Sequence, residues 1–218
     1  MTGLDPTVRD RLAAMGRVRT LRRGERLIHE GSSGGAVVLV LEGTLRVTRV
    51  IGSEEVVLAV RGPGDLLGEL GPITGGTARA SVEAREAGRV VVMPSSRFLE
   101  AQRDDPSIAT AIVDRLVQML TDSDRRLANA RRRSLVSRVA QELCVLASIA
   151  ATDGQEPPSD VMVTQSELAS LCIASRSSVA EAVGELRTSG VIDTGRSRVT
   201  ILDRAELEHL ADSETEPR

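Results

Sequence analysis

The fold of the last third of this chain is decided by residues 164–201, TQSELASLCIASRSSVAEAVGELRTSGVIDTGRSRVTI. The stretch opens on Thr164-Gln165-Ser166-Glu167, which has the pattern of a capping box. In such a box the threonine hydroxyl accepts from the amide three residues on, and the glutamate side chain reaches back. A turn at Ile173-Ala174 follows, and Ser175 is placed to cap a second helix. The pattern therefore predicts two short helices joined by a tight turn.

The second of these helices has two distinct faces, and a hairpin follows it. Its buried face is predicted to hold Val179, Val183 and Leu186, and its outward face to hold Arg176, Ser177, Ala180, Glu181 and Gly184. A turn at Thr194-Gly195 then leads into the alternating strand 198–201. Helix, tight turn, helix and hairpin in this order indicate a winged helix-turn-helix.

A helix-turn-helix inserts the N-terminal residues of its second helix into the major groove of DNA. Arg176 stands at that position, and the planar guanidinium matches the O6 and N7 acceptors of guanine. Hydroxyl groups near exposed helix amides suit phosphate oxygens, and arginines on the hairpin can reach the neighbouring backbone. The predicted DNA-contacting residues are Thr164, Gln165, Ser175, Arg176, Ser177, Ser178, Glu181, Arg196 and Arg198.

Before residue 106 the chain reads as short β-type runs separated by glycine-containing turns. Such runs occupy residues 36–41, 44–50, 55–60 and 89–93, and residues 1–18 carry weak helical signals in front of them. Many short strands at nearly even spacing are typical of a sandwich or barrel.

From Pro106 the pattern becomes helical, since a proline suits the first turn of a helix. Apolar or small residues recur in steps of three and four at Ile108, Ile112, Leu116, Met119, Ser123, Leu127 and Ala130. A single long stripe favours a coiled-coil seam and a dimer, while packing against the chain's own β domain is the alternative. A second helix is expected at 134–150, followed by a polar linker at 153–160.

The expected fold class is therefore α+β, with three parts. Residues 1–105 form a β domain with a short N-terminal helix, residues 106–133 form the dimerisation helix, and residues 134–218 form the winged helix-turn-helix.

Composition excludes several classes of function. The 218 residues include one phenylalanine, no tryptophan or tyrosine, and no lysine, a bias for which a GC-rich genome also accounts. Stacking platforms for single-stranded nucleic acid and Schiff-base chemistry are therefore not expected. Two cysteines and two histidines support no metal site and no Ser–His triad, so we expect no enzyme. No apolar run approaches the ~20 residues that span a bilayer, and a cytoplasmic protein without membrane contact is expected.

Charge gives no general support for DNA binding. The net charge is −3, and residues 131–218 hold 10 arginines against 14 acidic residues. A basic footprint over the last third is therefore absent, and specificity is expected to depend on few contacts.

The ordered set of motifs resembles the cyclic-AMP receptor protein (CRP/FNR) family of bacterial transcription regulators across nearly the whole chain. The matching residues are Gly24, Gly31, Glu42-Gly43, Gly62, Gly64-Asp65, Gly68-Glu69-Leu70-Gly71, the long helix, Thr164 to Ala169, and Ser175-Arg176. The resemblance implies a cyclic-nucleotide-binding β-roll of the jelly-roll type, a dimerising helix, and a winged helix that binds a two-fold operator. It also implies RNA polymerase as a partner.

In this family the β-roll holds cyclic AMP, and the resemblance assigns the corresponding residues here. Gly68, Glu69 and Leu70 match the backbone- and ribose-contacting motif, and Arg79 lies at the spacing of the phosphate arginine counted forward from Gly68. Counted backward from Ala80-x-Val82-x-Ala84, Arg79 falls instead in the slot of a serine or threonine. The loop then has one residue fewer than the family pattern, and Thr77 or Ser81 would have to supply the hydroxyl.

Four further positions depart from the family. Ala80 follows Arg79 where the family has a hydroxyl, and Asp124 stands beside Ser123, the residue that matches one base-contacting position on the dimer helix. Glu69 and Arg79 could alternatively pair with each other in an empty pocket. On the recognition helix Glu181 replaces a second arginine and Ser177 replaces a glutamate. We therefore expect an operator that differs from the common family palindrome.

These observations predict a homodimeric DNA-binding regulator modulated by a cyclic nucleotide such as cyclic AMP. One alternative is a regulator of the same fold that binds DNA without a cyclic nucleotide or with another ligand. An alternative of another class is a cyclic-nucleotide-binding signalling module whose winged helix contacts protein.

Overall fold

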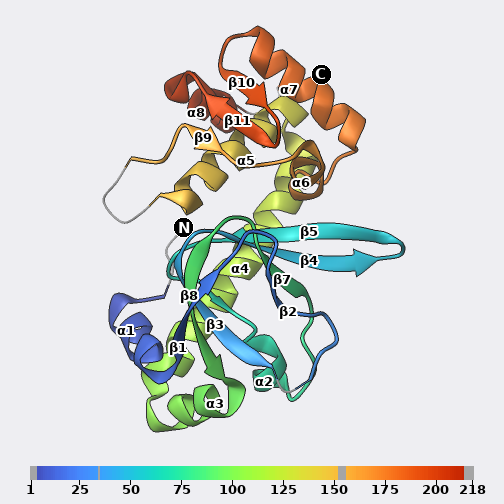
Figure 1. The fold of residues 1–218 in the computed structure, drawn as a ribbon. Helices are drawn as coiled ribbons and strands as arrows, with labels where there is room; N and C mark the ends of the chain where they lie inside the picture. The colour runs from blue at the N-terminus through green and yellow to red at the C-terminus, as the bar shows by residue number, and fades with distance from the viewer. Residues whose placement is uncertain (1–3, 34, 152–155, 214–218) are drawn as a thin grey trace. The chain divides into compact units, whose positions relative to one another are not determined.

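The computed structural model describes residues 4–33, 35–151 and 156–213 (Figure 1). The chain forms two compact units, residues 1–120 and 121–218, and the boundary lies inside one long helix. The start of the polar linker expected at 153–160 lies outside the described residues. The division into parts at residues 105 and 133 remains a prediction.

The first unit is built around two antiparallel sheets. One has the strand order β1-β8-β3-β6 and the other β2-β7-β4-β5. The strands are β1 (Arg17–Leu21), β2 (Arg26–Ile28), β3 (Ala36–Glu42), β4 (Leu45–Ile51), β5 (Glu54–Arg61), β6 (Leu66–Leu67), β7 (Ser81–Ala84) and β8 (Gly88–Pro94). The strands expected at 36–41, 44–50, 55–60 and 89–93 are confirmed to within one residue at each end.

Strand β3 lies in the middle of this unit because both of its faces are apolar. Val37 and Leu39 pack into one core, and Val38 and Val40 pack into the core between the two sheets. All four residues are at most 1% exposed. A continuous apolar run is what a strand buried on both sides requires.

Helices cover the outer face of the first sheet. They are α1 (Pro6–Met15), α3 (Ser95–Asp104) and the first part of α4 (Pro106–Arg132), and the short α2 (Leu70–Thr74) follows β6. Phe98 of α3 and Leu12 of α1 are fully buried with Met93 in the core beneath these helices. Phe98 is the only aromatic side chain of the chain, and aliphatic residues supply the rest of this core.

The apolar stripe on α4 is divided between two faces, which corrects the single seam expected from the sequence. Ile108 and Ile112 are 0% and 5% exposed and pack, with Leu116, into the core of the first unit. For these residues the alternative of packing on the chain's own β domain is the right one. A second stripe is exposed instead, and its members are Val113, Val117, Leu120 and Leu127, each 57–64% exposed.

The second unit contains the expected helices and hairpin. Its elements are α5 (Leu135–Ala150), β9 (Asp160–Val161), α6 (Gln165–Leu171), α7 (Arg176–Thr188), β10 (Ile192–Gly195), β11 (Arg198–Ile201) and α8 (Arg204–Asp212). The strands pair in the order β10-β11-β9, and α5 packs against α8 and α7 (Figure 1). The α+β class and the C-terminal winged helix-turn-helix are thus confirmed.

Candidate functional site

The predicted nucleotide motif begins at a backbone position that only glycine fits. Gly68 follows β6 with φ +82°, a conformation that other L residues rarely adopt. A Cβ at this position would lie 2.6 Å from Cδ1 of Ile28 and 2.7 Å from the carbonyl oxygen of Ala36. The close approach presses the loop against the end of β3 and leads directly into Glu69 and α2.

Glu69 presents a buried carboxyl group at the start of α2. The residue is only 7% exposed, and burial raises the pKa of its carboxyl group above the ordinary value. The positive charges of Arg61 and Arg115 oppose this rise, and the negative charge of Asp65 adds to it. Arg79 is exposed whereas Glu69 is buried, and the structure shows no ion pair between these two described residues.

A buried ion pair joins the same loop to α4. Arg115 of α4 donates to a carboxylate oxygen of Asp65, and both side chains are 9% exposed. The second oxygen of Asp65 accepts from the amide of Gly62 at 3.0 Å. Both oxygens of the aspartate are thereby used, and α4 is fixed to the turn that precedes Gly68.

The loop around Arg79 is held by backbone hydrogen bonds of its neighbour. The amide of Ala78 donates to the carbonyl of Ser32 at 2.9 Å, and the carbonyl of Ala78 accepts from Gly31 at 2.8 Å. Ala78 packs toward the core between the sheets, Arg79 is exposed, and Ala80 is half-buried. The role of Arg79 in holding a phosphate stays a prediction.

The two hydroxyl groups considered as substitutes near Arg79 lie in different environments. Ser81 is buried, and its Oγ accepts from the amide of Glu30 at 3.0 Å, while Thr77 is exposed. Ser123 and Asp124 are exposed on the part of α4 that belongs to the second unit. The structure therefore groups Gly68, Glu69 and Leu70, and the roles of Ser123 and Asp124 stay predictions.

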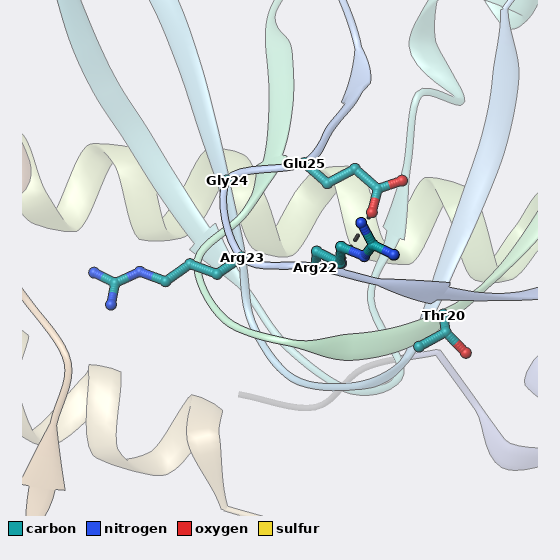
Figure 2. A pocket seen from close by; sticks show the side chains of 5 residues that line it. All are labelled: Thr20, Arg22, Arg23, Gly24 and Glu25. Carbon is teal, nitrogen blue, oxygen red and sulfur yellow. Dashed lines mark hydrogen bonds between the residues drawn. The ribbon is translucent and has the colours of Figure 1, made fainter.

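A surface pocket of about 650 Å³ lies elsewhere on the first unit, at the turn between β1 and β2. Figure 2 shows the five residues that line it, Thr20, Arg22, Arg23, Gly24 and Glu25. The backbone amide of Arg22 donates to Glu25 at 2.9 Å and closes the turn. None of the predicted nucleotide-contacting residues lines this pocket.

In the second unit the capping box of α6 is formed as predicted. The amide of Glu167 donates to Oγ1 of Thr164 at 3.1 Å, and the amide of Thr164 donates to the Glu167 carboxylate at 2.8 Å. Thr164 is half-buried, and Gln165 at the first helical position is exposed.

The N-terminus of α7 carries an exposed arginine within a group of serine hydroxyls. Ser175 caps the helix, since its Oγ accepts from the amide of Ser178 at 3.1 Å. The same Oγ lies 2.9 Å from the hydroxyls of both Ser177 and Ser178. Arg176 and Glu181 are exposed on one face, whereas Val179, Ala182, Val183 and Leu186 are buried on the other. This is the face division expected of a recognition helix.

The hairpin β10–β11 brings the two predicted wing arginines to the surface. Arg196 and Arg198 are both exposed, but Arg198 forms an ion pair with Asp160 of β9 at 3.4 Å. Asp160 also accepts from the hydroxyl of Thr200 at 2.6 Å. A contact between Arg198 and a phosphate would therefore compete with Asp160.

A second buried carboxyl group lies on α5. Glu142 is 7% exposed and forms an ion pair with Arg126 on α4, with 3.2 Å between its Oε1 and Nε of the arginine, while its Oε2 makes no hydrogen bond with the described residues. Burial raises the pKa of this carboxyl group, Arg126 opposes the rise, and Asp122 adds to it. Arg138, one turn earlier on α5, donates to the carbonyl of Cys172 at the end of α6.

Sequence reasoning missed Arg61, Arg115 and Asp65 as groups around Glu69. Asp65 was recognised only as part of a family motif, and its partner lies 50 residues away on another element. One signal was available for Arg115. It lies three residues after Ile112 and one before Leu116, and so on the side of α4 that faces the core.

Within the described residues, none of the helices has the length and apolar character to cross a membrane. The same residues contain no group of three or more histidine, cysteine, aspartate or glutamate side chains that could hold a metal ion. Both cysteines are free, and burial is the main reason that the pKa of Cys144 is raised to about 11 and that of Cys172 to about 12.

Comparisons with known proteins agree with both halves of this description. Residues 18–105 match the cyclic nucleotide-binding domain family, and residues 137–210 match the Crp-like helix-turn-helix domain family. The Cyclic AMP receptor protein of Thermus thermophilus is 29% identical over 210 residues, covering 96% of this chain and 94% of that protein. A CRP-like cAMP-activated global transcriptional regulator of Mycobacterium tuberculosis is 27% identical over 191 residues, covering 87% of this chain and 85% of that protein.

A solved structure shows the same arrangement of elements. The crystal structure of a CRP/FNR-family transcriptional regulator from Thermus thermophilus matches with a TM-score of 0.75 and 25% identity, covering 91% of this chain and 100% of that chain. Both domain matches, the relatives over most of their length and the shared fold point to one family. The chain belongs to the cyclic-AMP receptor protein (CRP/FNR) family of transcription regulators.

Proposed function

We propose that this chain acts as a homodimer that reads a two-fold DNA site with α7 and responds to a cyclic nucleotide bound in the β-roll. The observation that carries the proposal is the N-terminus of α7, where an exposed Arg176 stands beside the capping serines. Exposed helix amides and hydroxyls suit phosphate oxygens, and the guanidinium suits guanine. RNA polymerase remains a predicted partner.

Selection from random double-stranded DNA, followed by affinity measurements at several salt concentrations, tests the DNA-binding half of the proposal. Arg176→Ala should weaken binding at least about thirtyfold and relax the preference for guanine at one position of each half-site, because a bidentate contact is worth about 1–3 kcal/mol and the homodimer loses two of them. Arg187→Ala, in the last turn of the same helix, serves as the matched control. A selected site without two-fold symmetry would contradict the proposal, as would an Arg176 variant with unchanged preference.

The exposed stripe on α4 supports the dimer. Val113, Val117, Leu120 and Leu127 are spaced by four, three and seven residues, which is the a/d spacing of a coiled-coil seam. Val117→Asp should place charges in that seam and convert the dimer into a monomer, as measured by light scattering coupled to gel filtration. Gln118→Asp introduces the same charge one residue away, outside the stripe, and should leave the dimer intact. A monomeric wild-type chain would refute this part of the proposal.

Glu69 supports a ligand in the β-roll. It is a buried carboxyl group next to a glycine-fixed loop, and the positive charges of Arg61 and Arg115 act on it. A sugar hydroxyl can donate a hydrogen bond to such a buried carboxylate. Calorimetric titration with cyclic AMP should show binding to the wild type and at least tenfold weaker binding to Glu69→Gln. Equal affinity of both proteins, or no heat with either, would refute a cyclic-AMP site at Glu69.

The exposure of Arg79 favours one second candidate, a DNA-binding regulator that needs no cyclic nucleotide. A phosphate needs a positive charge in a partly dry cavity, and the arginine side chain lies outside the core. Mobility shifts with the selected DNA, with and without saturating cyclic AMP, distinguish the two candidates. Identical affinity in both conditions would favour the ligand-independent regulator.

The acidic character of residues 131–218 favours a candidate of another class, a cyclic-nucleotide-binding signalling module whose winged helix contacts protein. DNA binding that weakens steeply with salt would exclude it, because neutralised phosphates release counterions.

A further inference from the structure

The turn between α6 and α7 contains a side chain that its backbone disfavours. Ile173 has φ +52°, and a β-branched residue in this left-handed region is a genuine outlier. The turn closes α6 with two hydrogen bonds, Ile173 N to Ser170 O at 3.3 Å and Ala174 N to Ala169 O at 3.0 Å. This is the Schellman pattern, in which the position of Ile173 is usually glycine.

Ile173 obtains little burial in return for this conformation. The residue is 55% exposed, although a glycine would form the same two backbone hydrogen bonds without strain. An exposed isoleucine at a glycine position therefore has no explanation in the packing of the unit. Strained residues of this kind persist at functional sites, and the inference runs from the observed outlier to a function.

The outlier lies next to the predicted DNA contacts. Ile173 stands two residues before the cap of α7 and three before Arg176. In the described residues the one other non-glycine residue with positive φ is Ser197, at the tip of the β10–β11 hairpin. Both strained positions thus fall in the two segments that a winged helix presents to DNA, the start of the recognition helix and the wing.

We infer that Ile173 contacts the C5-methyl group of a thymine in the major groove, next to the base read by Arg176. The inference rests on the proposed function and adds a specificity-determining residue to it. Thymine offers the one apolar group among the base edges of the major groove, and apolar side chains read it. An isoleucine that enters the groove with the N-terminus of α7 would favour a thymine and disfavour cytosine at that position.

Deoxyuracil tests the contact directly, because it removes the methyl group and keeps every hydrogen-bonding group of thymine. Each thymine of the selected site is replaced in turn, and binding is measured for the full-length wild type and for Ile173→Gly. At one position, uracil in one half-site should weaken wild-type binding about fourfold, which is the value of burying one methyl group. Uracil in both half-sites should weaken it about fifteenfold, because two methyl groups are then lost. Ile173→Gly should show no uracil penalty at that position and should keep the penalties at all others.

Two variants serve as controls for the measurement. Ile173→Val keeps the branched Cβ and should keep most of the uracil penalty. Leu202→Ala removes an equally exposed apolar side chain, 60% exposed, that follows β11 and should leave the penalty unchanged. Because the glycine variant relieves the strained turn, its melting temperature should not fall.

Several results would overturn the inference. The first is that no thymine-to-uracil replacement weakens DNA binding by the wild type. The second is that the loss of affinity caused by uracil persists in Ile173→Gly. The third is that Ile173→Gly leaves the effect of uracil unchanged and alters promoter activity only when RNA polymerase is present. The last result would identify Ile173 as a protein contact. A wild-type protein that binds no DNA at all would refute the proposed function together with the inference. The selection of a DNA site, which precedes the uracil series, distinguishes this result from the others.

Discussion

The ion pair between Asp65 and Arg115 permits a sharp prediction about the stability of the first unit. Both side chains are 9% exposed, and the second aspartate oxygen is used by the amide of Gly62. Asp65→Asn leaves the charge of Arg115 without its partner, and breaking a buried pair on one side costs about 3–5 kcal/mol. We expect a loss of about 3 kcal/mol, at the lower end of that range, because the neighbouring Glu69 carboxylate also attracts Arg115.

Arg115→Met should cost about as much, because it leaves a buried carboxylate with the Gly62 amide as its remaining partner. The double variant Asp65→Asn/Arg115→Met should lie within about 1 kcal/mol of the wild type, because a buried ion pair replaced as a whole is often nearly neutral. Comparing the changes in the free energy of unfolding of the single and double variants isolates the interaction between the two side chains from the cost of changing either position.

Hydrogen exchange resolved by peptide is the appropriate assay, because a chain of two units need not unfold in one step. Peptides from β3, whose central residues are almost fully buried, report the opening of the first unit. Each single variant should exchange about a hundredfold faster there, since 1.4 kcal/mol corresponds to a factor of ten. Peptides from α7, in the second unit, serve as the internal reference. Single variants that change exchange in β3 less than fivefold, or a double variant that is worse than either single one, would refute the reasoning.

Three further outcomes follow from individual side chains and backbone positions. Burial raises the pKa of Glu142 above the ordinary 4.5, so above that pH the folded chain binds more protons than the unfolded chain. The free energy of unfolding therefore falls as the pH rises from 4.5 towards the raised pKa. Glu142→Gln should therefore reduce the fall of the melting temperature between pH 4.5 and 7. An unchanged dependence of the melting temperature on pH would contradict this prediction. With pKa values of about 11 and 12, Cys144 and Cys172 should react with iodoacetamide at pH 8 at least a hundredfold more slowly than an ordinary thiol, as followed by mass spectrometry. Gly68→Ala should destabilise the first unit by more than about 2 kcal/mol, because its Cβ would lie 2.7 Å from a backbone oxygen. Gly75→Ala has open space around its Cβ and should cost about 1 kcal/mol, as measured by denaturation.

Elements with a strong local pattern were predictable from the sequence, and polar edge strands were not. The run at residues 36–41 has no polar residue, and it forms the strand that is buried on both faces. The capping box at Thr164 specified the start of α6 through contacts within four residues. By contrast β1 is exposed at four of its five residues, including Val18, so its apolar residues do not mark one buried face.

The surroundings of the candidate sites depended on contacts between distant segments. The stripe on α4 contains enough apolar residues for two faces, and only the packing of Ile108 and Ile112 shows which face turns inward. The orientation of Arg79 follows from hydrogen bonds between Ala78 and residues 31–32, which no count of loop residues reveals. Ile173 is the reverse case, because local turn chemistry favours glycine at that position. The sequence preference and the structure disagree there, and the proposed thymine contact accounts for the disagreement.

Phe98, fully buried on α3, has a practical consequence for studies of this protein. Because it is the only aromatic residue, the chain has almost no absorbance near 280 nm and no tyrosine or tryptophan emission. DNA in a complex can then be quantified by its own absorbance without correction for the protein. Incorporation of fluorinated phenylalanine would give one fluorine resonance for the whole chain, located in the core under α1, α3 and α4. Changes in that single line would report whether binding of an added ligand alters the packing of the core beneath these helices.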